Sequence, residues 1–263
     1  MKIAWLFFLI LALTFSNKAH VEMKDKPPLR MTIIYDNYPH DKNLRTDWGF
    51  SCYAEGLDKS ILFDTGRNGQ ILLSNLRKLC LDPSKIDAVF LSHEHKDHTD
   101  GLDALLGANP RIEVWAPKFF ASSFKARVRQ SGAVLREVQK FQRIGEDALT
   151  TGVIEGWIKE QSLILDTDKG VVVITGCAHP RIIKILAEVD KHLKKDIDLV
   201  LGGFHLAGFD RPYIKTIIRE FRRFGVKKVG PCHCSGDEAR RLFEEEYGAD
   251  FIEIGVGKRI ELE

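Results

Sequence analysis

The stretch that decides the fold is His93-Glu94-His95-Lys96-Asp97-His98, which places three imidazoles and a carboxylate that could bind metal within six residues. It follows the apolar run at residues 88–91, so a short buried strand would deliver these side chains to one point. His93 and His95 are two residues apart and share a face if the backbone stays extended. Neutral imidazole and carboxylate are ligands of zinc, iron and manganese. The spacing therefore predicts a transition-metal site.

Polar side chains also follow other predicted strands. A single histidine at a strand end is more often a hydrogen-bonded surface or core residue. Ligands, however, commonly bind outside the carboxyl ends of strands, so several such ends favour one shared site. The ends are Asp64 after residues 61–63, Cys177 and His179 after residues 171–175, His205 after residues 199–202, and His233 after residues 226–230.

The residues beside the cysteines indicate which way their side chains point. Pro180 disfavours a helical conformation at His179, so Cys177 and His179 are expected on an extended segment, pointing the same way. Cys232 and Cys234 flank His233 and would point away from it. We interpret both as packing residues, with a redox role as the alternative. The odd total of five cysteines indicates no disulfide framework.

The pattern of strands and helices predicts an α+β fold. The early part of the chain is rich in strands and the late part alternates strand and helix, which predicts two packed sheets with helices outside in one domain, residues 31–263. Residues 117–132 are ambiguous and could include a short helix. We expect strands at 31–36, 49–55, 60–64, 88–91, 112–115, 133–138, 154–158, 162–166, 171–175, 199–202, 226–230, 251–254 and 259–262, and helices at 69–79, 180–192, 212–224 and 237–247.

The first residues have the pattern of an export signal. Lys2 precedes an apolar run at residues 3–15, which is about the length of a signal h-region and short for a membrane span. We predict a signal peptide at residues 1–19 and a linker at 20–30. The protein is then expected to be periplasmic or secreted, without a stable membrane span after cleavage. The alternative is a membrane anchor formed by an uncleaved segment.

The charge balance bears on the partners. The formal net charge is +2, and residues 1–19 contribute Lys2 and Lys18 without any acidic residue. The remainder therefore holds 37 basic and 37 acidic residues (39 − 2 against 37). A neutral mature protein lacks the basic field of a nucleic-acid binder, so we expect a small-molecule substrate and no nucleic acid. The sequence does not define an oligomeric state.

Asp64-Thr65-Gly66, the cluster at residues 93–98 and the later strand-end histidines follow one another in an order that resembles the metallo-β-lactamase-fold superfamily. The resemblance implies a four-layer αβ/βα sandwich with a dinuclear metal centre at one edge. It implies that Asp64 supports the site by hydrogen bonding. Many members have a bridging Asp where this chain has Cys177; either its thiolate ligates metal, or His179 takes over and water alone bridges. The implied ligands are His93, His95 and His179 at one metal, and Asp97, His98 and His233 at the other.

Four short runs resemble one branch of that superfamily, which is named for the 7,8-dihydropterin-6-methyl-4-(β-D-ribofuranosyl)aminobenzene 5′-phosphate synthase of methanopterin biosynthesis. The predicted leader argues against transferring the named reaction, since pterin assembly belongs in the cytoplasm. The runs are Tyr35-Asp36-Asn37, Thr175-Gly176-Cys177-Ala178-His179, Gly202-Gly203-Phe204-His205-Leu206 and Pro231-Cys232-His233-Cys234.

The expected cofactors are two divalent transition-metal ions, zinc, with iron or manganese as alternatives. We predict a hydrolase in which metal-bound hydroxide attacks an ester, lactone or phosphoester. Asp97 and His205 are the predicted catalytic residues, His205 as general acid or substrate contact; alternatively His205 only supports a ligand. The alternative functions are a synthase of the branch type, and a non-hydrolytic metal or redox protein with Cys177 and iron at its centre.

Overall fold

The computed structural model describes residues 28–262. The predicted signal peptide at residues 1–19 and most of the predicted linker at 20–30 lie outside the described residues. The first strand begins at Leu29, slightly before the expected domain start, and pairs at once with the last strand of the chain. Within the described part of the chain, no helix is long and apolar enough to cross a membrane.

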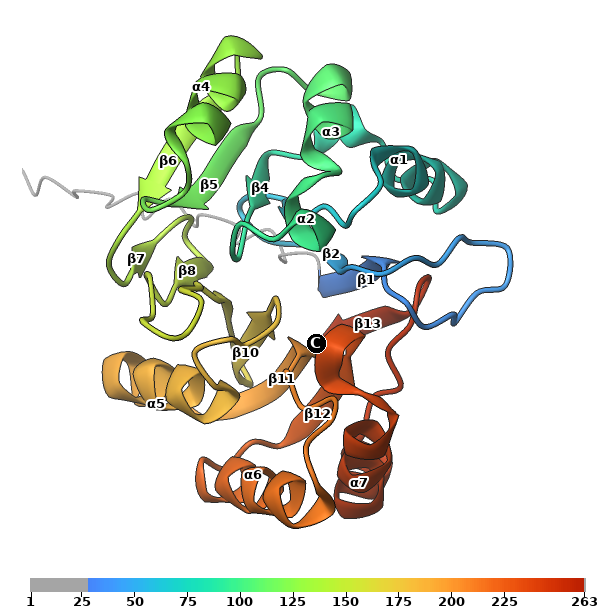
Figure 1. The fold of residues 1–263 in the computed structure, drawn as a ribbon, viewed down its shortest axis with the longest axis vertical. Coiled ribbons are helices and arrows are strands. Elements are labelled where there is room, and N and C mark those ends of the chain that lie inside the picture. Colours follow the sequence, from blue (N-terminus) through green and yellow to red (C-terminus); the bar gives the residue numbers. More distant parts are fainter. Residues whose placement is uncertain (1–27, 263) are drawn as a thin grey trace, which may run out of the picture.

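Residues 28–262 form two sheets that pack face to face (Figure 1). The first has the order β13-β1-β2-β3-β4-β5-β6; it is antiparallel from β13 to β3 and parallel from β3 to β6. Its strands are β1 (Leu29–Tyr35), β2 (Ser51–Glu55), β3 (Ile61–Phe63), β4 (Ala88–Phe90), β5 (Glu113–Pro117), β6 (Val134–Val138) and β13 (Arg259–Leu262).

The second sheet has the order β12-β11-β10-β9-β8-β7. Strands β10, β11 and β12 run parallel, so their carboxyl ends meet at one edge, and the remaining pairs are antiparallel. Its strands are β7 (Gln142–Arg143), β8 (Ala148–Thr150), β9 (Leu163–Thr167), β10 (Gly170–Thr175), β11 (Ile197–Gly203) and β12 (Lys228–Cys232).

Helices cover the outer faces of both sheets, which completes a four-layer αβ/βα sandwich (Figure 1). Helices α1 (Gly69–Lys78), α3 (Leu102–Ala108) and α4 (Ser122–Gln130) lie outside the first sheet, and α5 (Ile182–Leu193), α6 (Arg211–Arg223) and α7 (Asp237–Tyr247) outside the second. The short α2 (Lys96–Thr99) lies at the edge. Single-turn 3₁₀ helices span Pro83–Lys85, His233–Ser235 and Gly248–Asp250. The predicted α+β sandwich is confirmed.

Local sequence explains where the helices begin and which face they bury. Asn68 accepts hydrogen bonds from two backbone N–H groups of α1, and Asp210 accepts one from Tyr213 at the start of α6. Helix α6 buries one stripe at helical spacing, formed by Ile214, Ile217, Ile218 and Phe221. Between the sheets, Phe63 stacks on Phe90 at 5.6 Å between ring centroids.

Two predicted strands are wrong. Residues 154–158 and 251–254 each contribute only an isolated bridge, at Ile154 and Phe251. The first segment contains Gly156 and the exposed Trp157, so it offers no continuous buried face to a sheet. Strands β7 and β8 were not predicted, because they are too short to show a period in sequence. The ambiguous residues 117–132 contain α4.

The chain turns sharply where strands end at the shared edge. Asp64 has φ 50°, Ala178 has φ 59°, His205 has φ 52° and His233 has φ 49°. These non-glycine residues occupy the left-handed region just after β3, β10, β11 and β12, a strained conformation that is often found at functional sites. The turns aim the following side chains across the edge of the sandwich.

Candidate metal centre

Three imidazoles form the first donor group, which we name group A: His93, His95 and His179. Nδ1 of His95 lies 3.0 Å from Nε2 of His93 and 3.2 Å from Nε2 of His179. The three nitrogens thus converge within 4.8 Å of one another. Burial, with the neighbouring imidazoles, lowers the pKa of His93 well below its usual range and that of His179 to about 3. Neutral rings that present lone pairs to one point fit a metal ion.

Asp97, His98 and His233 form the second group, which we name group B. Oδ2 of Asp97 lies 3.5 Å from Nε2 of His98 and 3.3 Å from Nε2 of His233. Burial opposes ionisation of Asp97, but the two histidines outweigh it and lower the carboxyl pKa. Burial likewise opposes protonation of His98, but the charge of Asp64 outweighs it and raises the His98 pKa to about 9. Both shifts have one cause, the close pairing of the carboxylates of Asp64 and Asp97 with the imidazoles of group B.

Asp64 lies behind the donors and forms hydrogen bonds to Ser92 and His98. Its Oδ1 accepts the backbone N–H of Ser92 at 2.7 Å, and its Oδ2 accepts the Ser92 hydroxyl and lies 2.7 Å from Nδ1 of His98. This bond leaves Nε2 of His98 facing Asp97. On the other side, Oδ1 of Asn37 lies 3.1 Å from Nδ1 of His233. Such outer partners commonly fix the tautomer and orientation of metal-binding imidazoles.

Glu160 is a buried residue that sequence reasoning missed. Its Oε1 accepts the backbone N–H groups of Gly176, Cys177 and Ala178, each at 3.0 Å, and its Oε2 accepts that of His179 at 2.9 Å. Burial raises the pKa of Glu160 to about 7, although these donors oppose the shift. The carboxylate fixes the loop that carries His179. The only sequence signal is a lone acidic residue before the apolar strand β9.

Cys177 lies between the two groups. Its Sγ is 3.3 Å from Nε2 of His98 and clusters with His93 as well. The predicted extended segment from Cys177 to His179 is wrong, because Ala178 adopts a left-handed conformation between them. Both side chains still reach the site, Cys177 between the groups and His179 in group A. Burial raises the pKa of the Cys177 thiol well above its usual range.

Cys234 corrects a further prediction. It was expected to point away from the site as a packing residue, yet its Sγ clusters with Cys177 and with an imidazole nitrogen of His205. The cause is His233, whose φ of 49° breaks the extended geometry on which that expectation depended. Cys232, in contrast, is fully buried in the core between the sheets, as predicted. All five cysteines lie in the described chain and are free thiols.

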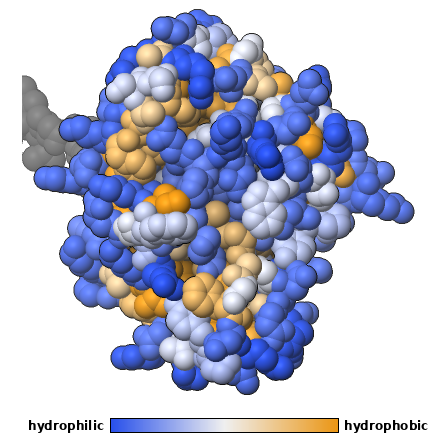
Figure 2. Space-filling model, in the orientation of Figure 1, coloured by the Kyte–Doolittle hydropathy of each residue, from blue (hydrophilic) through white to orange (hydrophobic). Residues whose placement is uncertain are grey.

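His205 is the exposed member of the cluster. Its ring centroid lies 4.6 Å from that of His179, on the solvent side of group A. It belongs to neither group A nor group B. A cavity of about 260 Å³ opens against this pair. In Figure 2, which keeps the orientation of Figure 1, apolar surface gathers near the region where α5 and α6 lie.

The donor set fits two transition-metal ions. Within residues 28–262, Nε2 of His233 is buried and has no hydrogen bond of normal geometry, although Oδ2 of Asp97 lies 3.3 Å away as an ion-pair partner. A metal ion held between the two would satisfy both groups. Five imidazoles, a carboxylate and a thiol suit zinc or iron better than calcium or magnesium. The structure thus brings together every predicted ligand, with Asp64 behind them.

Comparison with known proteins identifies relatives. The family model of the β-lactamase superfamily domain matches residues 59–150. The 7,8-dihydropterin-6-methyl-4-(β-D-ribofuranosyl)-aminobenzene-5′-phosphate synthase of Methanocaldococcus jannaschii is 30% identical over 255 residues, which cover 79% of this chain and 86% of that enzyme. An uncharacterized protein of the same organism is 29% identical and covers 87% of this chain and 98% of its own.

A solved structure is also similar along nearly its whole length. It is described as a metal-dependent hydrolase of the β-lactamase superfamily. The two chains superpose with a TM-score of 0.75 at 27% sequence identity, covering 89% of this chain and 99% of the other.

Proposed function

Because the chain belongs to the metallo-β-lactamase superfamily, we propose that it is a metal-dependent hydrolase that acts on an ester, lactone or phosphoester. The observation that supports this most is the pairing of group A with group B at one edge of the sandwich. His93, His95 and His179 would hold one divalent ion, and Asp97, His98 and His233 the other. Cys177 lies where it can contact both positions.

When bound, the ions would lower the pKa of water towards neutrality and polarise the carbonyl or phosphoryl oxygen of the substrate. The protein's own groups supply the rest of the chemistry. Asp97 would accept a hydrogen bond from the attacking water and orient it, since its neighbours keep the carboxylate ionised by lowering its pKa. Asp64 keeps His98 in a single tautomer through the hydrogen bond at Nδ1. Glu160 keeps His179 aimed at group A by fixing its backbone.

His205 is proposed to donate a proton to the leaving oxygen or to contact the substrate directly. Its exposed ring lies beside His179 on the side of the cavity, where a substrate would enter. Since it is not among the six proposed ligands, its replacement should spare the metal. His205→Gln is therefore expected to lower kcat while metal content stays unchanged. Loss of metal in that variant would instead make His205 a ligand.

A second candidate is a synthase of the dihydropterin-ribofuranosylaminobenzene phosphate type. The observation that favours it is the 30% identity to the enzyme of that name. A third, a non-hydrolytic metal or redox protein, is supported by the two thiols of Cys177 and Cys234 near the donor groups. Metal identity separates the third candidate, since redox-active iron would favour it and two zinc ions would favour hydrolysis.

The experiment is metal analysis of the purified protein followed by assay with 4-nitrophenyl butyrate, γ-nonalactone and bis(4-nitrophenyl) phosphate. We expect up to two ions per chain and metal-dependent turnover of at least one substrate. The His192→Ala variant, on the exposed surface of α5, is the matched control for any histidine variant. A protein that binds both ions and hydrolyses none of the three would contradict the hydrolase proposal.

We also propose that the protein is exported, from the apolar run at residues 3–15. The mature chain is then expected to begin near residue 17 or 20, outside the cytoplasm. Mass spectrometry of the protein purified from its native cell measures the first residue. An intact Met1 in a soluble cytosolic fraction would refute the proposal.

A further inference from the structure

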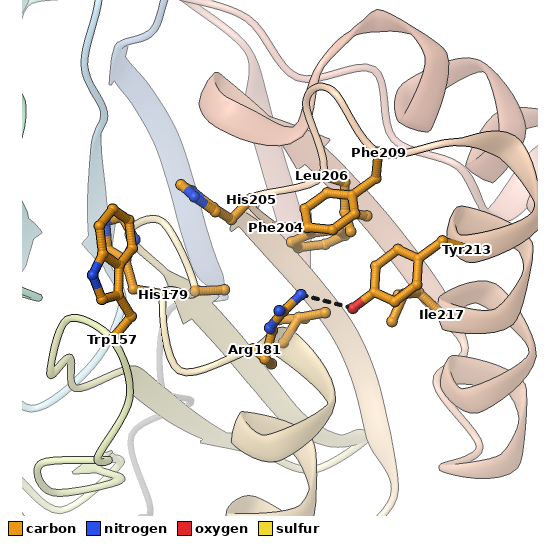
Figure 3. A pocket seen from close by; sticks show the side chains of 11 residues that line it. Trp157, His179, Arg181, Phe204, His205, Leu206, Phe209, Tyr213 and Ile217 are labelled. Atoms are coloured by element: carbon orange, nitrogen blue, oxygen red, sulfur yellow. Dashed lines mark hydrogen bonds between the residues drawn. The ribbon is translucent and has the colours of Figure 1, made fainter.

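The cavity beside His179 and His205 has walls that the proposed chemistry does not use (Figure 3). Its volume is about 260 Å³. The loop before β9 contributes one side, and the start of α5, the loop after β11 and α6 contribute the others. Apart from the two histidines, its wall includes Arg181 and the aromatic residues Trp157, Phe204, Phe209 and Tyr213.

Arg181 is the charged group of this cavity, and it is held in place. One guanidinium nitrogen, Nη1, donates to the hydroxyl of Tyr213 at 2.9 Å, the dashed line in Figure 3. The guanidinium carbon lies 5.5 Å from the ring centroid of Phe209 and 6.0 Å from that of Tyr213. Most of its hydrogen-bond donors remain available to a ligand, since a guanidinium has five N–H groups and Tyr213 accepts only one.

Two further observations describe the state of Arg181. Its backbone has φ 85°, a left-handed conformation that a side-chain-bearing residue rarely adopts. Within residues 28–262, it forms no ion pair with a carboxylate, so its charge is available to a ligand, and its hydrogen bond to Tyr213 holds it at the cavity wall. A positioned, unpaired cation on an apolar wall is suited to bind an anion that enters with an apolar body.

The opposite rim is aromatic and exposed. Trp157 is 87% exposed, the most exposed large apolar side chain among the described residues. Figure 3 shows its indole beside His179, across the cavity from Phe209 and Tyr213. An indole left in water at the mouth of an apolar cavity is suited to cover a bound ring.

We propose that this cavity selects substrates that carry a carboxylate or phosphate group on an apolar or aromatic body, with Arg181 binding the anion. The proposal rests on the proposed function only in placing the reacting bond beside His179. Arg181 would be a specificity-determining residue, and Tyr213 a positioning residue that acts through it. The apolar body would lie between Trp157 and Phe209.

The binding test uses two fluorescent probes that differ by one anionic group. They are 8-anilinonaphthalene-1-sulfonate and its neutral counterpart N-phenyl-1-naphthylamine, titrated into the metal-loaded protein. Arg181→Gln should raise the Kd of the sulfonate about tenfold and that of the neutral probe less than about twofold. Tyr213→Phe keeps the ring but frees the guanidinium, so a smaller, sulfonate-selective loss is expected. Arg219→Gln, on α6 outside the cavity wall, is the matched control.

Equal weakening of both probes by Arg181→Gln, or no change in either, would overturn the anion site. A catalytic arm compares 4-nitrophenyl butyrate with the mono-4-nitrophenyl ester of succinic acid. Arg181→Gln should lower kcat/KM for the charged ester alone. If neither ester is hydrolysed, the hydrolase proposal fails while the sulfonate titration still decides the anion site. The same comparison with phosphate-bearing esters in place of the succinate ester tells whether Arg181 selects a carboxylate or a phosphate group.

Discussion

Residues 29–138 form the first sheet except for its last strand, β13, and residues 142–232 form the second. Both the N-terminal half and the C-terminal half of the chain supply part of the metal centre, but they do so differently. The first half concentrates four donors between His93 and His98, in the loop after β4 and in the short helix α2. The second half places its donors at the ends of two strands, His179 after β10 and His233 after β12, with β11 between them. The parallel pairing of these strands carries residues far apart in sequence to one edge. A metal site can thus be built from one dense motif and several sparse ones.

The largest effect is expected from breaking the dense motif. Removal of a group that only orients a ligand commonly costs about 10–100-fold in metal affinity or activity. His95→Ala removes a central nitrogen of group A, so activity should fall by more than about 100-fold. The fold should survive, because the sandwich core is large. Metal analysis and circular dichroism measure the metal content and the fold of the variant, with His192→Ala as control. Full metal content in His95→Ala would contradict the assignment of His95 as a ligand.

The next effect tests how the C-terminal half holds its scattered donors. Glu160→Gln places an amide N–H₂ among backbone N–H donors, so at least one of them loses its acceptor. A buried unsatisfied donor costs about 1–3 kcal/mol, and we expect that loss in the free energy of unfolding. Urea denaturation measures it, and metal titration should show weaker binding through His179. Glu155 is exposed, so Glu155→Gln should change neither the free energy of unfolding nor the metal affinity. If Glu160→Gln also leaves both unchanged, the loop that carries His179 does not depend on Glu160.

The smallest effect concerns Cys177, where the halves meet. If its thiolate ligates metal, Cys177→Ser should weaken metal binding, while Cys177→Asp supplies a hard bridging carboxylate and retains two ions. We favour this outcome because Sγ lies 3.3 Å from Nε2 of His98. If Cys177 only packs, Ser should be nearly silent and Asp harmful, since it would bury an unpartnered charge. Metal titration of both variants against the parent distinguishes the two cases.

Sequence alone was sufficient for the dense motif and for most of the fold. The histidine cluster and Asp64 were predicted because residues that follow a strand within a few positions stay close together wherever that strand lies. Glu160 was not predicted, because its four partners lie 16–19 residues away, in the turn that follows β10. The predicted direction of the Cys234 side chain was wrong because no sequence pattern indicates that His233 adopts a positive φ. Local periodicity determines strands, but the turns that aim side chains depend on long-range packing.

The division of donors between the halves has a mechanical consequence. An ion in group A would join His93 and His95 of one half to His179 of the other, and an ion in group B would join Asp97 and His98 to His233. Bound metal would then cross-link the two halves of the chain at the edge of the sandwich where both groups lie. A ligand that binds the folded state alone adds about 2.7 kcal/mol at a hundredfold excess over its Kd. Resistance of the chain to heat and to proteases would therefore vary with the free metal concentration of its surroundings.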